Sequence, residues 1–299
     1  MLLSVVSGTV MKRMPVAREF ASFLSASKML RASCLALGIL GATTSAQAQA
    51  PTWPANLKAE YEVAFNGFGI GSFAFQAEAE RDTYNLKGSA SLSMLLGAIS
   101  WTSDIRAIGT VSDKLPQPSA YAFEVKSGSR GMMTRMGFED GAVNSVAHMP
   151  PQPPKPEIVP VRAQHLKGVV DPLSAMMMLA SSQAPCDRRI PIFDGRERFD
   201  LVFSRKGEVR ISEQSPSGQP SVGHVCRVRY VPIAGHKPDE YTQKMAENRD
   251  IEVVLRPVPS AHMFVPYQIS IPTPMGTATL TSKRVEIAQT GKPRIALLY

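Results

Sequence analysis

The sequence has little of what most catalytic proteins depend on. It contains no H-E-x-x-H, G-x-S-x-G or G-x-x-x-x-G-K-[ST] motif, so the common signatures of zinc proteases, serine hydrolases and P-loop nucleotide-binding proteins are missing. Its five histidines are scattered, and none lies four residues from another ligand type on a predicted helix. We therefore expect no metal site, no cofactor and no catalytic residue, and we predict that the protein is not an enzyme.

Long apolar runs are also missing, because no segment approaches the ~20 residues that a transmembrane helix needs. The longest apolar run, Cys34–Ala42, follows Lys28 and Arg31 and leads into two overlapping Ala-Gln-Ala sequences at residues 46–50. A positive start, a short apolar middle and an A-x-A end are typical of a secretory signal peptide. We predict a signal peptide over residues 1–50, cleaved near Ala48 or Ala50, and hence a periplasmic protein without a transmembrane anchor.

The alternative for this segment is an N-terminal membrane anchor, for which the apolar run is too short. Met1, Met11 and Met29 are all candidate start residues, and Met29 gives the most compact signal.

Half of the excess of positive charge lies in this segment. The chain has 33 basic and 25 acidic residues, of which five basic and one acidic lie in 1–50, so a net charge of +8 becomes +4 for residues 51–299. A modest charge on an exported protein is poor support for nucleic-acid binding, and we expect no nucleic-acid partner.

Cysteine is scarce, with three in 299 residues. Removal of the signal peptide takes Cys34 and leaves Cys186 and Cys226. Two cysteines in an oxidising compartment predict one disulfide. The alternatives are a catalytic thiol, which needs a positioned base, and a metal pair, although neither cysteine has a C-x-x-C or nearby histidine partner.

Most of the remaining chain alternates with a period of two. Tyr61, Val63 and Phe65 share one face of a predicted strand, and Asn66-Gly67 follows as a turn because both residues accept positive φ. Similar pairs of strands joined by tight turns recur to the C-terminus. This pattern predicts a mainly β fold, a curled antiparallel sheet that forms an open or spiral β-barrel.

One segment has helical spacing instead. Asp171 is a helix N-cap followed by proline at the first helical position, and Pro185 ends the apolar pattern. We predict one short helix at about 172–182, packed inside the curled sheet or against it. Either it fills a core or its soft methionines adapt to an apolar ligand. Its predicted cap and plug residues are Asp171, Pro172, Leu173, Met176, Met177 and Leu179.

Residues 186–203, CDRRIPIFDGRERFDLVF, carry eight charges. Ile190 and Ile192 alternate before Asp194-Gly195, and the charges fall mainly in the turn and on the opposite phase, which predicts a hairpin with a solvated charged face. The functional alternative is a hairpin tip that contacts an anion or a partner through Asp194, Arg196 and Arg198.

The proline-rich stretch 149–160, MPPQPPKPEIVP, favours extended conformation without regular pairing. We interpret it as a linker between two halves of the sheet, inside a single β-rich domain over 51–299.

Four segments in this order resemble one family of exported proteobacterial proteins, called domain of unknown function 3108. They are AEYEVAFNGFGIGSFAF, DPLSAMM, IPIFDGRERFDLVF and CRVRYVPIAGH. The resemblance implies a periplasmic location and a β-rich fold, with no established enzyme activity. The family also looks like the curled sheets of bacterial lipoprotein carriers and envelope-integrity spiral proteins, which is a likeness of fold alone.

Three functions remain open. The first is a non-enzymatic scaffold that binds an amphiphile, such as a lipid, or a protein of the cell envelope. The second is a structural envelope-integrity partner without a ligand. The third is an envelope hydrolase whose acid and base come together only in the folded chain, which no sequence motif excludes.

Overall fold

The computed structural model describes residues 56–299 except 81, 95–98, 113–114, 154 and 181–183. The described residues belong to one compact unit. The signal peptide expected at 1–50 lies outside them and stays a prediction.

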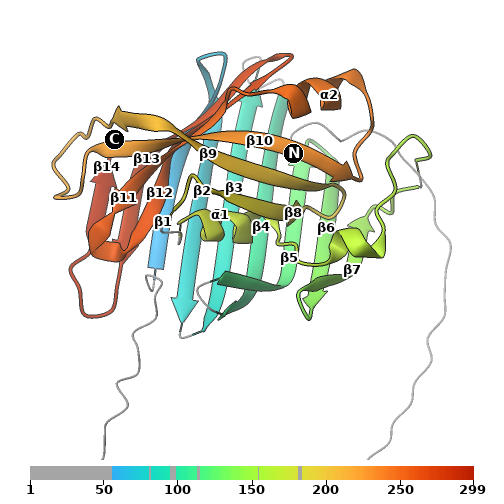
Figure 1. Cartoon of the computed structure of the whole chain (residues 1–299), viewed down its shortest axis with the longest axis horizontal. Coiled ribbons are helices and arrows are strands. Elements are labelled where there is room, and N and C mark those ends of the chain that lie inside the picture. The colour runs from blue at the N-terminus through green and yellow to red at the C-terminus, as the bar shows by residue number, and fades with distance from the viewer. Residues whose placement is uncertain (1–55, 81, 95–98, 113–114, 154, 181–183) are drawn as a thin grey trace, which may run out of the picture. The chain divides into compact units, whose positions relative to one another are not determined.

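Within those residues the chain forms one antiparallel sheet of 14 strands (Figure 1). The strands are β1 Asn56–Phe65, β2 Phe68–Glu80, β3 Thr83–Met94, β4 Ile99–Ser112, β5 Leu115–Ser127, β6 Arg130–Glu139, β7 Ala142–Met149, β8 Arg188–Phe193, β9 Arg198–Arg210, β10 Val222–Ala234, β11 Ile251–Val258, β12 Met263–Thr273, β13 Gly276–Ala288 and β14 Ile295–Leu298. The helices are α1 Pro172–Ala180 and α2 Glu240–Glu247, with short 3-10 turns η2 Ala163–Leu166 and η3 Pro259–Ala261. The predicted mainly β fold is confirmed.

The first hairpin begins with the predicted two-residue alternation of buried and exposed side chains. Leu57, Ala59, Tyr61 and Val63 are buried, while the residues between them are exposed or half-buried. The Asn66-Gly67 turn has φ values of 49° and 83°, the positive values that a tight hairpin turn requires. In β1 the sequence period therefore determines which face of the strand meets the core.

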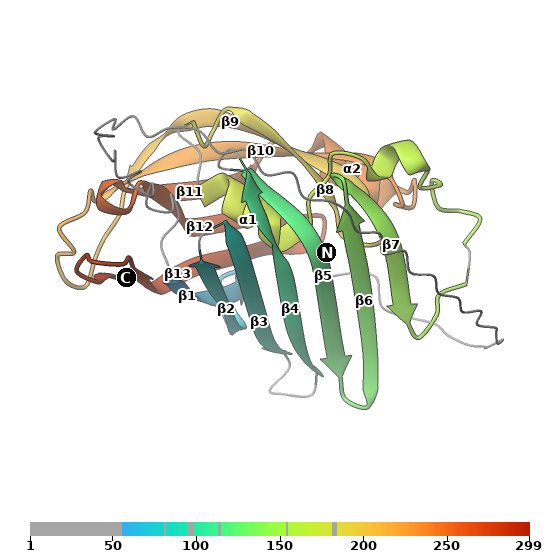
Figure 2. The same ribbon diagram turned by 90° about the horizontal axis from the view of Figure 1, so that it is seen from below.

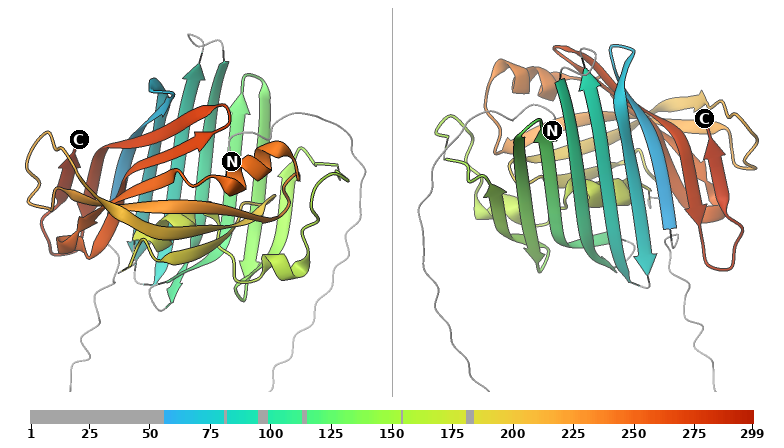
Figure 3. Two further views of the ribbon diagram at one scale, coloured as in Figure 1. Left: turned by 45° about the horizontal axis from the view of Figure 1, so that its top comes forward. Right: turned by 180° about the vertical axis from the view of Figure 1, so that it is seen from behind.

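The strand order has two halves that meet at β1 and β13. Strands β1 to β7 follow one another along the sheet, and the row continues from β13 back to β8, so β7 and β8 are its two ends. The right-hand view of Figure 3 shows the blue-to-green N-terminal strands as one continuous row. The stretch 149–160, expected to be a linker, starts at the last residue of β7 and leads toward η2.

The two ends of the sheet do not pair with each other. A short segment lies between them instead. Lys167 bridges to Ala142 of β7, and Val170 bridges to Ile192 of β8. We call residues 167–170 the seam segment. The barrel is therefore open as a sheet, and single bridges on either side of the seam segment span the gap.

Helix α1 fills the concave side of the sheet. Leu173, Met177 and Ala180 pack in a core cluster with the N-terminal strands, whereas Ala175 and Leu179 pack with β8 to β11. Figure 2 shows α1 between β9 and β10 on one side and β2 to β4 on the other. A helix that is apolar on all sides is buried on all sides. Helix α1 accordingly contributes to both core clusters.

The predicted disulfide is present in the structure. It joins Cys186, six residues after the end of α1, to Cys226 on β10, with Cα atoms 5.0 Å apart. Both cysteines are buried in the cluster that also holds Leu179. The bridge therefore fixes the exit of α1 to the C-terminal half of the sheet.

We expect either Cys186→Ser or Cys226→Ser to destabilise the protein about as much as the double substitution. The closed loop of 40 residues corresponds to about 4 kcal/mol in the chain-entropy model of unfolding. Chemical denaturation measures the loss, and thiol labelling of unreduced protein checks the bridge. Two freely labelled cysteines in folded, unreduced protein would contradict this prediction.

Candidate functional site

A buried polar cluster surrounds the start of α1. Asp171 Oδ1 accepts hydrogen bonds from the backbone N–H groups of Leu173 and Ser174, at 2.9 and 3.0 Å. Asp171 Oδ2 accepts the Ser174 hydroxyl proton at 2.5 Å. Since that hydroxyl has a single proton, Tyr84 donates its own to Ser174 Oγ at 2.8 Å. The predicted N-cap is thus the centre of a three-residue relay that ties α1 to β3.

Burial changes the protonation of this cluster. It raises the pKa of Asp171 from 3.8 to about 6, although the hydrogen bonds from Ser174 and Leu173 oppose the rise. Burial also raises the pKa of Tyr121, as do the nearby carboxylates of Asp171 and Asp194. The Tyr121 hydroxyl has no hydrogen-bond partner among the described residues. The cluster therefore combines a carboxyl that titrates near neutral pH with a phenol that stays protonated.

The burial of this cluster determines whether a substrate can reach it. Asp171 and Ser174 are 0 % exposed, and Tyr84 is 3 % exposed, so a substrate has no path to a nucleophile or base here. A general base must lie within hydrogen-bond reach of the proton that it removes. Within the described part of the chain, no group of three histidine, cysteine or carboxylate side chains is placed to hold a metal ion. The hydrogen bonds of the cluster position α1.

The charged hairpin corrects one expectation. We predicted that its charges lie on a solvated face, but Asp200 is 2 % exposed. Its Oδ1 accepts a hydrogen bond from Arg198 Nη1 at 2.5 Å, and its Oδ2 accepts one from Arg189 Nη1 at 2.9 Å. Asp200 does point away from Ile190 and Ile192, as its phase requires, but these two arginines on the same face cover it.

The turn of this hairpin also has an internal role. Asp194 Oδ1 accepts the backbone N–H groups of Arg196 and Glu197, at 2.9 and 2.8 Å, which holds the turn closed. Gly195 has a φ of 95°, and a Cβ atom there would lie 2.4 Å from Thr134 Cγ2 on β6. The turn between β8 and β9 is therefore packed tightly against the opposite end of the sheet.

His148 of β7 faces this turn. Its Nδ1 lies 3.1 Å from Thr134 Oγ1. Partial burial and the positive charge of Arg196 lower the pKa of His148, while Asp194 and the Gly195 backbone oppose that change. Of the predicted contact residues, Asp194 holds the turn, Arg198 pairs with Asp200, and the guanidinium of Arg196 reaches Met132 on β6. Anion binding at this tip stays a prediction, and the observed contacts are internal.

An apolar pocket lies at the other end of α1. Met176, Met177 and Ala180 form one wall, and strand residues that include Leu57, Tyr61 and Phe75 form the other. The free space is about 20 Å³, room for roughly one water-sized sphere. Of the plug residues predicted from sequence, Met176 and Met177 thus line a nearly filled cavity.

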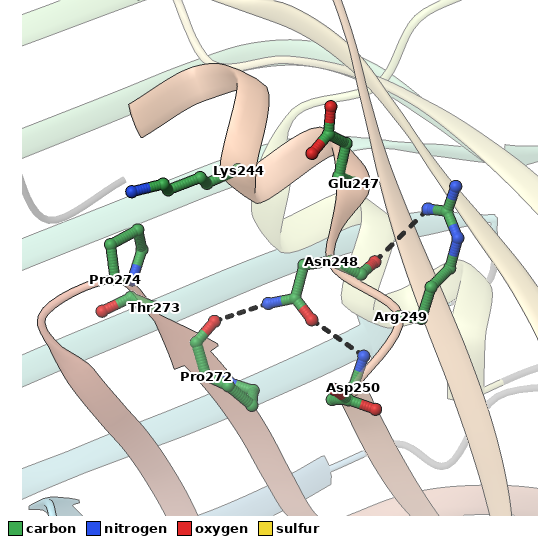
Figure 4. A pocket seen from close by; sticks show the side chains of 8 residues that line it. All are labelled: Lys244, Glu247, Asn248, Arg249, Asp250, Pro272, Thr273 and Pro274. Atoms are coloured by element: carbon green, nitrogen blue, oxygen red, sulfur yellow. Dashed lines mark hydrogen bonds between the residues drawn. The ribbon is translucent and has the colours of Figure 1, made fainter. Parts of the chain in front are cut away.

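A shallow surface cleft of about 410 Å³ lies between the end of α2 and the tip of the β12–β13 hairpin (Figure 4). Asn248 holds its floor, donating to the Pro272 carbonyl at 2.6 Å and accepting the Asp250 N–H at 2.8 Å. Lys244, Glu247 and Arg249 line the cleft, so charges of both signs face it. Sequence reasoning missed this cleft, because it depends on two segments that no motif connects.

Sequence reasoning also missed Tyr84, Ser174, Tyr121 and Thr134. The only available signal was the inward phase of the tyrosines on their strands, where an aromatic hydroxyl requires a buried partner.

We predict that Asp171→Asn removes a pH dependence of stability. The raised pKa means that the folded state favours the protonated carboxyl. Its stabilisation is complete below pH 3.8, the ordinary pKa, and is lost as pH rises through about 6. Denaturation curves should show the wild type losing about 2 kcal/mol more than Asp171→Asn between pH 4 and pH 7. Parallel curves would show that Asp171 does not titrate in this range.

We predict that Asp200→Asn costs about 3 to 5 kcal/mol of unfolding free energy, because it leaves Arg198 buried without its ion pair. The side chain of Arg198 is 11 % exposed, whereas that of Arg189 is 60 % exposed. The matched control Arg189→Ala should therefore cost less than about 1 kcal/mol. Equal losses in urea denaturation would argue against a buried pair.

Comparison with known proteins identifies a family and no activity. No curated protein matches the chain. A beta-barrel-like protein of domain of unknown function DUF1849 from Brucella abortus has a solved structure with a TM-score of 0.46 and 9 % identity, over 79 % of this chain and 99 % of that one. No helix among the described residues has the length and apolar character to cross a membrane. The family profile described as "Protein of unknown function (DUF3108)" matches residues 60–283, and the chain therefore belongs to that family.

Proposed function

We propose that this protein is a non-enzymatic binding scaffold of the bacterial cell envelope, exported to the periplasm, whose ligand is an amphiphile. The observation that carries the proposal is the apolar pocket between α1 and the sheet, where Met176 and Met177 face Tyr61 and Phe75. A helix inside a curled sheet is the natural place for an apolar ligand to bind.

The small volume of the pocket limits how a ligand can enter it. An acyl chain does not fit into about 20 Å³ and enters only if the wall moves. Methionine side chains are unbranched and have three rotatable bonds, so they can change rotamer at low cost. Met176 is half-buried, which makes it the wall residue with the most freedom. The ligand would therefore replace methionine contacts with its own.

The polar cluster at the start of α1 is used for structure. The Asp171–Ser174–Tyr84 relay is closed to solvent and its hydrogen bonds are used to cap the helix. An envelope hydrolase would need an accessible acid and base, and this cluster offers neither.

A structural envelope partner without a ligand is a second candidate, supported by two exposed apolar tips. Phe68 is 77 % exposed and Met275 is 59 % exposed. Their hairpins are adjacent, since Asn66 N–H donates to the Thr277 carbonyl and Thr277 N–H donates to Asn66 Oδ1, each at 2.8 Å. Apolar side chains grouped at a surface indicate contact with another molecule.

The amphiphile proposal is tested with the fluorophore N-phenyl-1-naphthylamine. We expect its emission to rise on binding, and Met176→Ala to bind it several-fold more tightly, because each additional buried CH₂ equivalent contributes about 0.8 kcal/mol. Met275→Ala is the matched control, since that methionine lies on the surface, and it should bind as the wild type does.

Two results would reject the amphiphile. One is unchanged emission with both the wild type and Met176→Ala. The other is native mass spectrometry and solvent extraction that find no bound lipid. Together they would leave the structural-partner role.

A further inference from the structure

The two ends of the sheet are protected very differently. An unpaired strand edge is a template for another chain, and proteins block such edges with charges, proline or a covering segment. The β8 end has all three, with Arg188, Arg189 and Pro191 in its sequence. Val170 covers it, donating to the Pro191 carbonyl and accepting the Phe193 N–H, each at 3.0 Å. The β8 edge is therefore closed to a further strand.

The β7 end has none of these devices along most of its length. Its eight residues, AVNSVAHM, include no proline and no aspartate, glutamate, lysine or arginine. The seam segment bridges to it at Ala142 only, among the described residues. Beyond that point Val146 is 39 % exposed and Met149 is 58 % exposed. Val143–Met149 thus forms a neutral strand edge with exposed apolar side chains.

We propose that the outer edge of β7 pairs with β7 of a second copy of this chain, antiparallel about a two-fold axis. The proposal does not depend on the ligand. Two-fold pairing places identical surfaces against each other, which requires that they be self-complementary. An uncharged strand meets this requirement, because no like charges oppose one another when β7 meets its own copy.

Whether the β8 edge is free to pair determines the symmetry of the assembly. Pairing of β7 with β8 of a neighbour would add molecules head to tail and grow without limit. Since the arginines, Pro191 and Val170 block β8, that arrangement has no free partner edge. Pairing of β7 with β7 uses up both open edges and closes at the dimer.

The length of the free edge sets the register. Its midpoint is Val146, so antiparallel overlap places Val146 opposite its own copy and Ser145 opposite Ala147. The bulge in the β6–β7 pairing falls at Asn144, which leaves Ser145–Met149 regular. The contact is short compared with the roughly 800 Å² per partner of a stable interface. The dimer should therefore be weak and dependent on concentration.

Sedimentation velocity on the purified wild type tests the proposal. Between about 1 µM and about 1 mM we expect monomer to convert to dimer, with a dissociation constant in that range. Val146→Lys brings like charges together at the two-fold axis and should remain monomeric throughout. Val209→Lys is the matched control, because Val209 on β9 is similarly exposed, at 41 %, and it should dimerise like the wild type.

Single cysteines test the register independently. Directly opposed residues in antiparallel strands have Cα atoms about 4.5 to 5.5 Å apart, within disulfide range. Val146→Cys should oxidise to a covalent dimer. Ala147→Cys, which lies opposite Ser145 of the second copy in this register, and Val209→Cys should not.

Three outcomes would overturn the proposal. The first is a wild type that stays monomeric over the whole range. The second is a Val146→Lys variant that dimerises as well as the wild type while its circular dichroism remains native. The third is a monomeric wild type whose β7 amides gain protection from hydrogen exchange only when an extended peptide is added, which would assign this edge to a different protein.

Discussion

A sheet whose two ends do not pair must bury its concave face in some other way, and α1 does so in this protein. The nine residues of α1 contribute to both core clusters, so they pack with the strands that precede the helix and with those that follow it. The capping relay fixes the start of the helix to β3, and the disulfide fixes its exit to β10. The arrangement of the two halves therefore depends on the position of one short helix.

The chain directly before α1 also bridges the gap between the two ends of the sheet. The seam segment ends directly before Asp171, so the residues that bridge β7 and β8 are continuous with the helix cap. The turn after β8 adds a second link, because Gly195 packs against Thr134 of β6. The cap and the turn lie close together, because the carboxylates of Asp171 and Asp194 both act on the Tyr121 hydroxyl. Three of the buried polar residues, Thr134, Asp171 and Ser174, lie in this region, while the apolar pocket lies toward the end of α1.

Period and turn chemistry predict this fold well, because both act locally. The alternation in Asn56–Phe65 and the position of Asn66-Gly67 are properties of adjacent residues. The N-cap of α1 is also local, since Asp171 bonds to groups two and three residues away. The cysteine pairing was predictable because only two of the three cysteines lie outside the predicted signal peptide, which leaves one partner for each.

Properties that depend on strands distant in sequence could not be predicted in this way. Asp200 has the phase of an exposed residue, but Arg189 and Arg198 bind its carboxylate, and Val231 of β10, 31 residues away, lies opposite it. Tyr84 meets Ser174 across 90 residues, and the seam joins strands at opposite ends of the sheet. The surface cleft beside α2 likewise needs the hairpin of β12 and β13. To predict any of these contacts, one must know which strands and segments are neighbours in the folded chain.

The distribution of groups along α1 gives the proposed amphiphile an orientation. The start of the helix places the Asp171 carboxyl and the Ser174 hydroxyl beside the phenols of Tyr84 on β3 and Tyr121 on β5. The last turn presents methionine and alanine. An apolar chain that enters beside Met176 and Met177 would lie against Leu57, Tyr61 and Phe75, with no buried polar atom to leave unsatisfied except the Tyr61 hydroxyl. That hydroxyl already donates to the Pro266 carbonyl at 3.1 Å. The polar head of such a ligand would therefore remain at the solvent side of the pocket, because the polar cluster at the far end of the helix is sealed by its own hydrogen bonds.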